Sequence, residues 1–472
     1  MPAYSSDDIS TWCNGIWNME PPSSISGFNI DARKVCCGEM FVALKAERDG
    51  HDFLFQAMEN GASAVLVNRE IKELGIPQLV VSDTLQGLHD IAREKRLRFD
   101  GRVVGISGSC GKTSTKDLLS HLLGSNILKT KENLNNHLGV PLTLLNLDNE
   151  SHNTAVVEVG INSKGEMKSL SELLIPEIVI ITMIGHSHLE GLGSVKETAQ
   201  EKAKLFQHSK KISNLVIHEE CLGYEEFSKW RDAGNTCLIL SEGEPEGEVK
   251  NGTANYKIWT ETNKIGGSLS LRLWRKGSPT LSLSLESMSR GMSKNVALAV
   301  LVACKLGVSS EEISERLPQY RPSALRGKFF RGRGRTYFVD CYNANPSSMK
   351  DSLDFFSEKF SSIPKLYILG GMEELGADGP RLHADAVAGL KVDEDDLFVM
   401  VGEKAGSYSS GLLHAGAREE QLVLLKNLED ARSLVEDFEG AVIFKGSRIN
   451  KLENLIPSWA VDYEEEREYV EC

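Results

Sequence analysis

Short apolar runs alternate with helical patterns through the middle of the chain. The apolar run Val103–Ile106 leads into a glycine-rich turn, and a helical pattern follows over Lys112–Leu123. Two more apolar runs, Ala155–Val159 and Ile178–Met183, are separated by a further helical stretch. Because strands that alternate with helices form βαβ units with parallel strands, the pattern predicts an α/β fold built on a parallel sheet.

The flanking parts of the chain repeat this alternation. Helices are predicted over Leu85–Arg96, Asn295–Leu306 and Ser310–Leu317. One segment differs, because leucines alternate with polar residues on both sides of the turn Gly277–Pro279 and so predict a half-buried hairpin over Ser268–Leu285. Further strands are predicted at 40–44, 64–67 and 78–81, and near the end at 337–339, 365–369, 397–401 and 441–444.

The chain is too long for a single core. A length of 472 residues suggests about three domains. Two segments without apolar periodicity, Arg98–Gly101 and Pro318–Pro322, are expected to be linkers. We therefore predict domains over residues 1–99, 100–322 and 323–472, the last with a second open parallel sheet.

Composition narrows the classes of function. The apolar fraction is 41% and the formal net charge is −14, with no basic cluster on any predicted helix, which argues against a nucleic-acid partner. Nine scattered cysteines without metal-type spacing favour a reducing compartment. No basic segment followed by an apolar stretch opens the chain, and the apolar run Ile178–Ile184 is too short to span a bilayer. We therefore expect a cytoplasmic protein without a membrane partner.

The segment Gly108–Thr113 carries the clearest chemical signal. It reads Gly-Ser-Cys-Gly-Lys-Thr and lies between a predicted strand and a predicted helix, where backbone N–H groups and the helix dipole can bind phosphates. Lys112 is expected to reach the β- and γ-phosphates of a nucleotide, and the Thr113 hydroxyl is expected to bind Mg²⁺. Cys110, close to the helix N-terminus, is expected to have some thiolate character. The alternative is a glycine turn followed by a chance Lys-Thr pair.

Two polar residues follow the next strands of the predicted parallel sheet. Glu158 lies at the end of one strand, and His188 lies just beyond the end of the other. Ligands of open α/β sheets bind outside the carboxyl ends of the strands, so a carboxylate and an imidazole there could hold a metal near the phosphates. Each residue alone would be interpreted as a solvated polar group.

Several longer motifs share their residues with a known family. They are Asn133–Pro141, Glu158–Gly160, His188–Ser194, Asp340–Pro346, Leu369–Gly376 and Lys445–Arg448. Together they resemble the motifs of the Mur ligase family, in particular of its MurF branch. The resemblance extends from the N-terminal part of the chain to about residue 450.

This resemblance implies an α/β architecture of three domains: a UDP-substrate-binding domain, a central phosphate-loop ATPase and a Rossmann-like C-terminal domain that binds an incoming dipeptide. It implies an ATP-dependent ligase that forms an amide bond through an acyl phosphate in peptidoglycan precursor synthesis. The implied partners are UDP-N-acetylmuramoyl-tripeptide and D-alanyl-D-alanine, and we expect a monomer. The alternative is a weakly active homologue that binds a muramoyl precursor or regulates cell-wall partners.

The resemblance also implies roles for individual residues. Lys202, which would otherwise be interpreted as a surface lysine, matches a lysine that is carbamylated in the family, and a carbamate offers Mg²⁺ two oxygens that a protonated lysine cannot. The implied metal ligands are Thr113, Glu158, His188 and Lys202, and the implied catalytic residues are Lys112, His188, Lys202 and Arg326. ATP is expected to contact Gly108, Ser109, Cys110, Gly111, Lys112, Thr113, Ser114, Asn295, Asp340, Tyr342 and Asn343, and the muramoyl substrate to contact Arg33, Lys45, Asn135 and Asn136.

Four positions depart from the family pattern. Lys294 and Leu298 stand where histidine and asparagine are frequent, Gly371 stands where aspartate is usual, and Ala46 stands where glycine is usual. We expect these departures to affect the placement of ATP and of the dipeptide more than the reaction. His383 matches a family histidine that could equally be structural.

Overall fold

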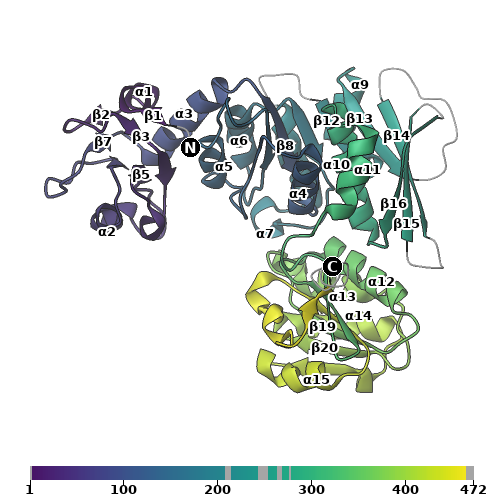
Figure 1. Ribbon diagram of the computed structural model, residues 1–472. Coiled ribbons are helices and arrows are strands. Elements are labelled where there is room, and N and C mark those ends of the chain that lie inside the picture. Colours follow the sequence, from purple (N-terminus) through teal and green to yellow (C-terminus); the bar gives the residue numbers. More distant parts are fainter. Residues whose placement is uncertain (1–2, 208–213, 243–253, 263–267, 276–277, 464–472) are drawn as a thin grey trace, which may run out of the picture. The chain divides into compact units, whose positions relative to one another are not determined.

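The computed structural model describes residues 3–207, 214–242, 254–262, 268–275 and 278–463. They form two compact units, the first made of Met1–Ser107, Leu123–Ile180 and Glu201–Leu215, and the second of Gly108–Leu122, Ile181–Gln200 and Val216–Cys472. Both units combine largely parallel sheets with helices, which confirms the predicted α/β class (Figure 1). In the described ranges no helix is both long and apolar enough to cross a membrane.

A five-stranded sheet forms the N-terminal part of the first unit. Its strands in spatial order are β2 (Ile16–Trp17), β7 (Gln78–Val80), β6 (Ala64–Val67), β5 (Glu39–Val42) and β4 (Gly27–Asn29). The strands from β4 to β7 are parallel, and β2 joins the edge antiparallel to β7. The three predicted strands are confirmed, whereas the shorter β2 and β4 had no detectable pattern. The remaining elements here are β1 (Tyr4–Ser5), β3 (Ser24–Ile25), α1 (Ser6–Trp12) and α2 (Leu54–Glu59).

The predicted helix after these strands is α3 (Thr84–Leu97). It begins where the Asp83 carboxylate accepts a hydrogen bond from the Gln86 N–H at 2.8 Å, a typical N-cap. Arg96 at its end is buried, and its guanidinium donates to the Leu174 carbonyl at 2.7 Å and to the Ile175 carbonyl at 2.8 Å. The helix is thereby fixed to α6 (Glu166–Leu174) within the first unit.

The apolar runs of the central part are strands, as predicted, and they form a second set of strands in the first unit. Their spatial order is β11 (Ile178–Ile181), β8 (Arg102–Ser107), β10 (Thr154–Glu158) and β9 (Ile127–Lys129). β8 and β10 are parallel, with Val104 opposite Val156, and both side chains are fully buried. Burial on both faces explains why these strands read as continuous apolar runs. α5 (Gly139–Leu144) belongs to the same unit. α8 (Val195–Gln207) belongs to it from Glu201 onward.

In the second unit the strands β12 to β16 lie in order of sequence. The predicted hairpin is confirmed as β15 and β16, which pair antiparallel with Leu271 opposite Leu283, although Gly277 of the predicted turn lies outside the described residues. α10 begins at Arg290 and not at Asn295, because the Ser289 hydroxyl caps it by accepting from the Met292 N–H at 3.2 Å. The bounds are β12 (Asn214–His218), β13 (Cys237–Glu242), β14 (Ala254–Thr262), β15 (Ser268–Arg275), β16 (Ser278–Glu286), α4 (Lys112–Leu123), α7 (Leu189–Leu192), α9 (Glu225–Asp232), α10 (Arg290–Lys305) and α11 (Ser310–Arg316).

The C-terminal part of the second unit contains a seven-stranded sheet. Its spatial order is β21 (Leu422–Leu425), β20 (Leu397–Val401), β19 (Lys365–Gly370), β22 (Ala441–Lys445), β18 (Arg335–Asp340), β17 (Lys328–Gly332) and β23 (Val461–Asp462). The five strands from β21 to β18 are parallel, as predicted. The expectation of a purely parallel sheet is wrong at one edge, where β17 pairs antiparallel with both β18 and β23.

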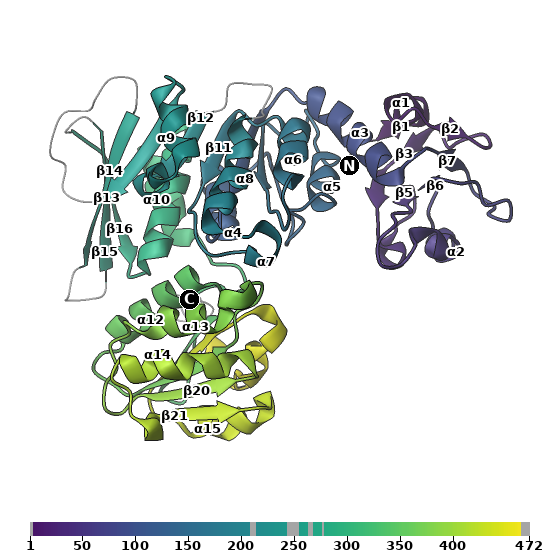
Figure 2. The same ribbon diagram turned by 180° about the vertical axis from the view of Figure 1, so that it is seen from behind.

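Helices cover both faces of this sheet. Alternate residues of one strand enter different cores: Tyr367 packs in the core beneath α12 (Pro346–Lys359), α13 (Gly379–Val387) and α14 (Tyr408–His414), and Ile368 packs in the core beneath α15 (Arg432–Asp437). Figures 1 and 2 show α12, α13 and α14 on one side of the strands and α15 on the other. This is the doubly wound arrangement, whose ligand sites lie at the carboxyl ends of the strands.

Candidate functional site

The predicted phosphate loop adopts a tightly constrained turn in the second unit. The Ser109 N–H donates to the Met183 carbonyl at 2.9 Å, and the Ser109 hydroxyl donates to the Gly185 carbonyl at 3.0 Å. A Cβ atom on Gly108 would lie 1.9 Å from the Thr182 hydroxyl oxygen, so only glycine fits there. Gly111 has a φ of 81°, the left-handed conformation that favours glycine. Both glycines of the motif are therefore required by geometry.

The loop leads directly into α4, so the first N–H groups of that helix and its positive dipole end lie at the loop. The Lys112 ammonium donates to the Gly108 carbonyl at 2.8 Å and thus lies across the loop. Lys112, Thr113 and Ser114 are half-buried. A cationic side chain, backbone donors and a hydroxyl thus gather in one short segment, as binding of a nucleotide phosphate requires.

The surroundings of the Cys110 thiol bear on its expected thiolate character. Burial raises its pKa above the usual range, and this effect outweighs the opposite influence of the nearby Lys445 and Lys112 ammonium groups. This direction argues against the predicted thiolate character, because desolvation opposes the favourable position near a helix N-terminus.

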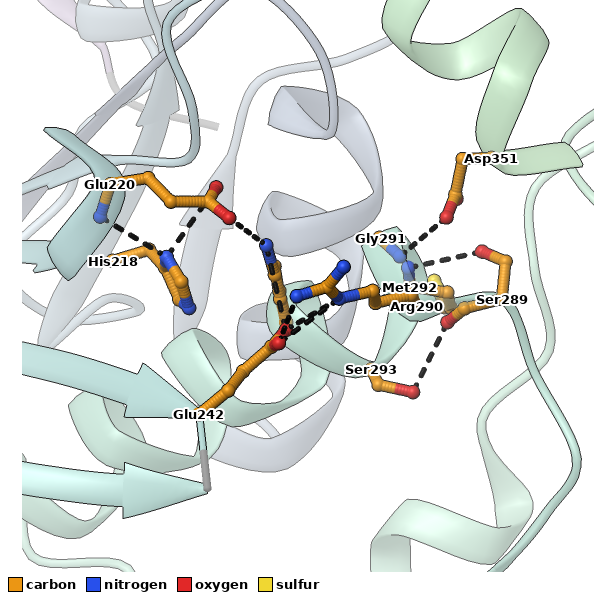
Figure 3. Close-up of polar contacts among 10 residues, drawn as sticks. His218, Glu220, Glu242, Ser289, Arg290, Gly291, Met292, Ser293 and Asp351 are labelled. Atoms are coloured by element: carbon orange, nitrogen blue, oxygen red, sulfur yellow. Dashed lines mark hydrogen bonds and ion pairs between the residues drawn. The ribbon is translucent and has the colours of Figure 1, made fainter. Parts of the chain in front are cut away.

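Asn295 lies against the phosphate loop. A Cβ atom built on Gly111 would come within 2.5 Å of the Asn295 side-chain oxygen, so the amide packs directly on this glycine. The preceding Lys294 donates to Glu220 at 2.8 Å. Arg290 binds Glu242 through its Nε at 3.0 Å (Figure 3). The start of α10 is thus held by two ion pairs and contacts the loop through Asn295.

Two predicted nucleotide ligands, Asp340 and Asn343, are joined by a lysine that the sequence reasoning missed. Lys445, buried at the end of β22, donates to the Asp340 carboxylate at 2.6 Å and to the Asn343 carbonyl at 3.2 Å. The Arg326 guanidinium lies over the Tyr342 ring, 3.9 Å from its centroid. The available signal was the Lys445–Arg448 motif, in which a lysine ends a buried strand.

Asn345 contacts the phosphate loop from α12. Its side-chain amide donates to the Ser109 carbonyl at 3.1 Å, while its side-chain oxygen accepts from the Ser348 N–H at 2.9 Å and caps the helix. The segment Asp340–Pro346 therefore contributes to the surroundings of the loop through a residue that was not among the predicted ligands.

His188 has a strained backbone and a specific partner. Its φ is 52° and that of Glu374 is 60°, both in the region that non-glycine residues rarely adopt. The His188 Nδ1 lies 2.5 Å from a Glu374 carboxylate oxygen, and the Leu189 N–H donates to the Glu374 carbonyl at 3.0 Å. The hydrogen bond from His188 is the main cause that lowers the pKa of Glu374. Strain held by matched contacts is typical of functional sites.

The other predicted metal ligands lie in the first unit. Glu158 is buried at the end of β10, where its Oε1 accepts a hydrogen bond from the Asn135 amide at 2.8 Å. Lys202 on α8 is fully buried, which excludes the alternative of a surface lysine. A buried carboxylate and a buried lysine that could carry a carbamate suit a hard cation. Within the described residues, no group of three or more His, Cys, Asp or Glu is arranged to hold a metal ion.

The predicted substrate-binding residues have varied surroundings. The Asn136 side-chain oxygen accepts from the N–H groups of Leu138 and Gly139, at 3.1 and 3.0 Å. Arg33 is exposed and binds Asp31 through two nitrogens, at 2.9 and 2.8 Å. Lys45 is exposed. These contacts leave their role in substrate binding a prediction.

His383 is structural. It is buried, its Nε2 accepts from the Met372 N–H at 2.8 Å, and its Nδ1 lies 2.6 Å from the Gly379 carbonyl. The two contacts require the neutral ring with the proton on Nδ1. His383 thus fixes the turn that follows β19.

Comparison with known proteins identifies the family. The model of the Mur ligase middle domain matches residues 106–303, and that of the Mur ligase glutamate ligase domain matches residues 326–448. The UDP-N-acetylmuramoyl-tripeptide--D-alanyl-D-alanine ligase of Synechocystis sp. is 31% identical over 82% of this chain and 82% of the relative. The ligase of the same name from Bacillus subtilis is 29% identical over 92% of each chain.

Solved structures agree with the sequence relatives. A crystal structure of MurF from Acinetobacter baumannii has a TM-score of 0.83 and 27% identity, and covers 97% of this chain and 98% of that chain. The MurF ligase from Thermotoga maritima in complex with ADP has a TM-score of 0.74 and 25% identity, with 91% and 96% covered. On the strength of these matches, the chain belongs to the Mur ligase family.

Proposed function

We propose that this protein is an ATP-dependent ligase that joins D-alanyl-D-alanine to UDP-N-acetylmuramoyl-tripeptide. Relatives that match more than nine-tenths of the chain carry this activity in their names. The observation that supports it best is the phosphate loop, because its two glycines, the Lys112 ammonium and the start of α4 form a phosphate-binding turn. The proposed domains are residues 1–99 for the UDP substrate, 100–322 for ATP and 323–472 for the dipeptide.

The proposed reaction has two steps. An oxygen of the tripeptide's terminal carboxylate attacks the γ-phosphorus of ATP, the bond to the β–γ bridging oxygen breaks, and ADP leaves. The uncharged amine of D-alanyl-D-alanine then attacks the acyl-phosphate carbon, phosphate leaves with the electron pair of the broken bond, and the new amide loses one proton to solvent. Phosphorylation is needed because a carboxylate is a poor electrophile at neutral pH.

The residues of the chain act by position and charge. Lys112 and the loop N–H groups offset the negative charge that develops on the transferring phosphoryl group. Asn295 lies at the loop and suits a contact to the nucleoside side, while Arg326 stacked on Tyr342 offers a cation beside an aromatic face. No covalent intermediate with the protein is needed, since binding and electrostatic stabilisation supply the rate enhancement.

We propose that Thr113, Glu158, His188 and a carbamylated Lys202 hold Mg²⁺. The ion would neutralise phosphate charge and orient the oxygens of ATP. Glu374 fits this scheme, because a carboxylate on one ring nitrogen of His188 fixes the tautomer and leaves the other nitrogen to bind a ligand. Burial of Lys202 also fits, because carbamylation requires the neutral amine and desolvation disfavours the ammonium form.

We propose that Arg33, Lys45, Asn135 and Asn136 contact the muramoyl substrate. Exposed basic side chains suit a diphosphate, although Arg33 must exchange its contact with Asp31 to bind one. The proposed location is the cytoplasm, a reducing compartment that supplies ATP. The thiols agree with it, because the cysteines among the described residues are free.

The test is phosphate release that depends on both acceptors. The purified chain is supplied with ATP, Mg²⁺, a panel of UDP-muramoyl peptides and a panel of dipeptides, and the amide product is identified by mass spectrometry. We expect release only when UDP-muramoyl-tripeptide and D-alanyl-D-alanine are both present, and none from a Lys112→Met variant. Phosphate release that is indifferent to the dipeptide would refute the ligase assignment and favour a precursor-binding ATPase.

A further inference from the structure

One carboxylate connects α10 and α12 in the second unit. Asp351 lies on α12, and its Oδ1 accepts a hydrogen bond from the Gly291 N–H at 2.8 Å (Figure 3). Gly291 is in the first turn of α10, where N–H groups have no partner within the helix and where the dipole favours a negative charge. α10 lies in the segment matched by the middle-domain model and α12 in the segment matched by the C-terminal model.

The contact requires glycine at position 291. A Cβ atom built there would lie 2.6 Å from Asp351 Oδ2 and 3.0 Å from Asp351 Cγ. The first distance is shorter than real Cβ atoms show, and the second is tighter than most real Cβ contacts, so a side chain at this position would displace the carboxylate. Burial raises the pKa of Asp351, against the opposite effect of hydrogen bonds from Ser289 and from the Gly291 N–H. The hydrogen bonds from Ser289 and Gly291 thus offset part of the cost of burying the charged Asp351 carboxylate.

The N-terminal end of α10 also contacts the phosphate loop. Asn295 packs on Gly111, and the ion pairs of Lys294 with Glu220 and of Arg290 with Glu242 hold neighbouring positions of the helix start. α12 also contacts the loop at its own N-terminus, where Asn345 donates to the Ser109 carbonyl. α12 is therefore joined to the loop directly through Asn345 and indirectly through Asp351 and α10.

We propose that Asp351 is a positioning residue for the nucleotide, which it affects without contacting it. By holding the first turn of α10 through Gly291, it sets the distance of Asn295 from the phosphate loop. This inference rests on the proposed ATP site and deepens it: a residue of the C-terminal part controls nucleotide affinity. The motifs that resemble the family do not contain Asp351.

The first experiment measures ADP binding to the full chain by calorimetry, together with the KM for ATP and for the dipeptide. Asp351→Ala should weaken ADP binding by about tenfold, as expected when one hydrogen bond to a charged group is lost. The KM for ATP should rise by a similar factor, whereas kcat and the KM for the dipeptide should change little. Asp351→Asn, which keeps an oxygen for the Gly291 N–H, should restore most of the affinity. Asp354→Ala is the matched control, because Asp354 lies on the same helix, and its side chain, 41% exposed, pairs with Lys350 at 3.2 Å.

The second experiment separates positioning from general stability. Gly291→Ala should weaken ADP binding in the wild-type background, because its methyl group meets the Asp351 carboxylate. In the Asp351→Ala background the same substitution should have no further effect, since the carboxylate is gone. Gly291→Ala equally harmful in both backgrounds, or ADP affinity unchanged in Asp351→Ala, would overturn the inference while the ligase proposal stands. A wild-type chain that binds no ADP would overturn both.

Discussion

Replacing Lys202 tests the proposed metal site most directly. Its side chain is fully buried on α8, so truncation has two separable consequences. Lys202→Ala removes three methylene groups beyond Cβ, and at about 0.8 kcal/mol for each buried methylene the packing loss alone is about 2.4 kcal/mol of unfolding free energy. Lys202→Met keeps an apolar side chain of similar length and should lose much less stability. The two variants therefore differ in packing but share the loss of any carbamate.

Activity should follow the carbamate and not the packing. If Lys202 supplies an anionic ligand to Mg²⁺, both variants should lose at least about 100-fold in kcat, equivalent to about 2.7 kcal/mol of transition-state stabilisation. Short-chain carboxylates such as formate should partly restore Lys202→Ala, which leaves a space for them. They should not restore Lys202→Met, whose side chain fills that space. Lys204→Ala is the matched control, since Lys204 lies on the same helix and pairs with Glu201.

The assay combines turnover with a direct view of the modification. Labelled bicarbonate should give a carbamate carbon signal in the nuclear magnetic resonance spectrum of the wild-type protein and of Lys204→Ala. The signal should be missing from both Lys202 variants. Full activity of Lys202→Met without added acid would remove Lys202 from the mechanism and leave Glu158, His188 and Thr113 as the proposed ligands. A carbamate signal that persists in Lys202→Met would place the modification elsewhere.

Three further outcomes follow from the site. Lys112→Ala should lower kcat/KM by about 100- to 1,000-fold with little change in melting temperature, because the half-buried Lys112 ammonium donates to the Gly108 carbonyl of the loop; more than about a tenth of the activity would contradict its role. Cys110 should react slowly with iodoacetamide at neutral pH and faster as pH rises, since its pKa is raised, and Mg-ATP should protect it; labelling indifferent to nucleotide would contradict an enclosed phosphate. Burial lowers the pKa of His383 in the folded protein below its value of 6.5 in the unfolded chain. The neutral ring therefore contributes to the free energy of unfolding above pH 6.5, and this contribution is lost as pH falls through the lower pKa of the folded protein. The wild type should therefore lose more melting temperature between about pH 8 and about pH 5 than His383→Gln, and equal losses would refute the assignment.

The elements that the sequence predicted well are those whose pattern is local. β6, β10 and β19 are apolar runs buried on both faces, and α3 has a regular apolar stripe with a cap at Asp83. Strands of two or three residues, such as β2 and β23, carry no periodicity and were missed. The start of α10 was missed because Gly291 and the polar residues of its first turn weaken the helical pattern, and only the cap at Ser289 marks the boundary.

The contacts that organise the site are distant in sequence. Asn345 and Ser109 are 236 positions apart, and neither residue type indicates the other. The phosphate loop could be predicted because its chemistry is contained in one short segment between a strand and a helix. Lys445 and Glu374 lie in motifs that resemble the family, but their contacts with Asp340 and His188 could not be predicted, because only the fold brings these partners near. Asp351 lies in none of these motifs, and its contact with Gly291 likewise depends on the fold.

The departures from the family pattern also have local physical reasons. Leu298 and its neighbours Ala297 and Ala299 are fully buried and carry no side-chain amide, so nothing here replaces the asparagine that is frequent at position 298. A Cβ atom on Gly371 would lie 2.8 Å from the Cβ of Lys404, so an aspartate could be accommodated there only if Lys404 moved. Because the Leu298 side chain is buried in the core, Asn295 is the residue of this helix that we propose to contact the nucleoside side of ATP. The contacts that hold the start of α10 should therefore matter for nucleotide affinity in this chain, because they position Asn295.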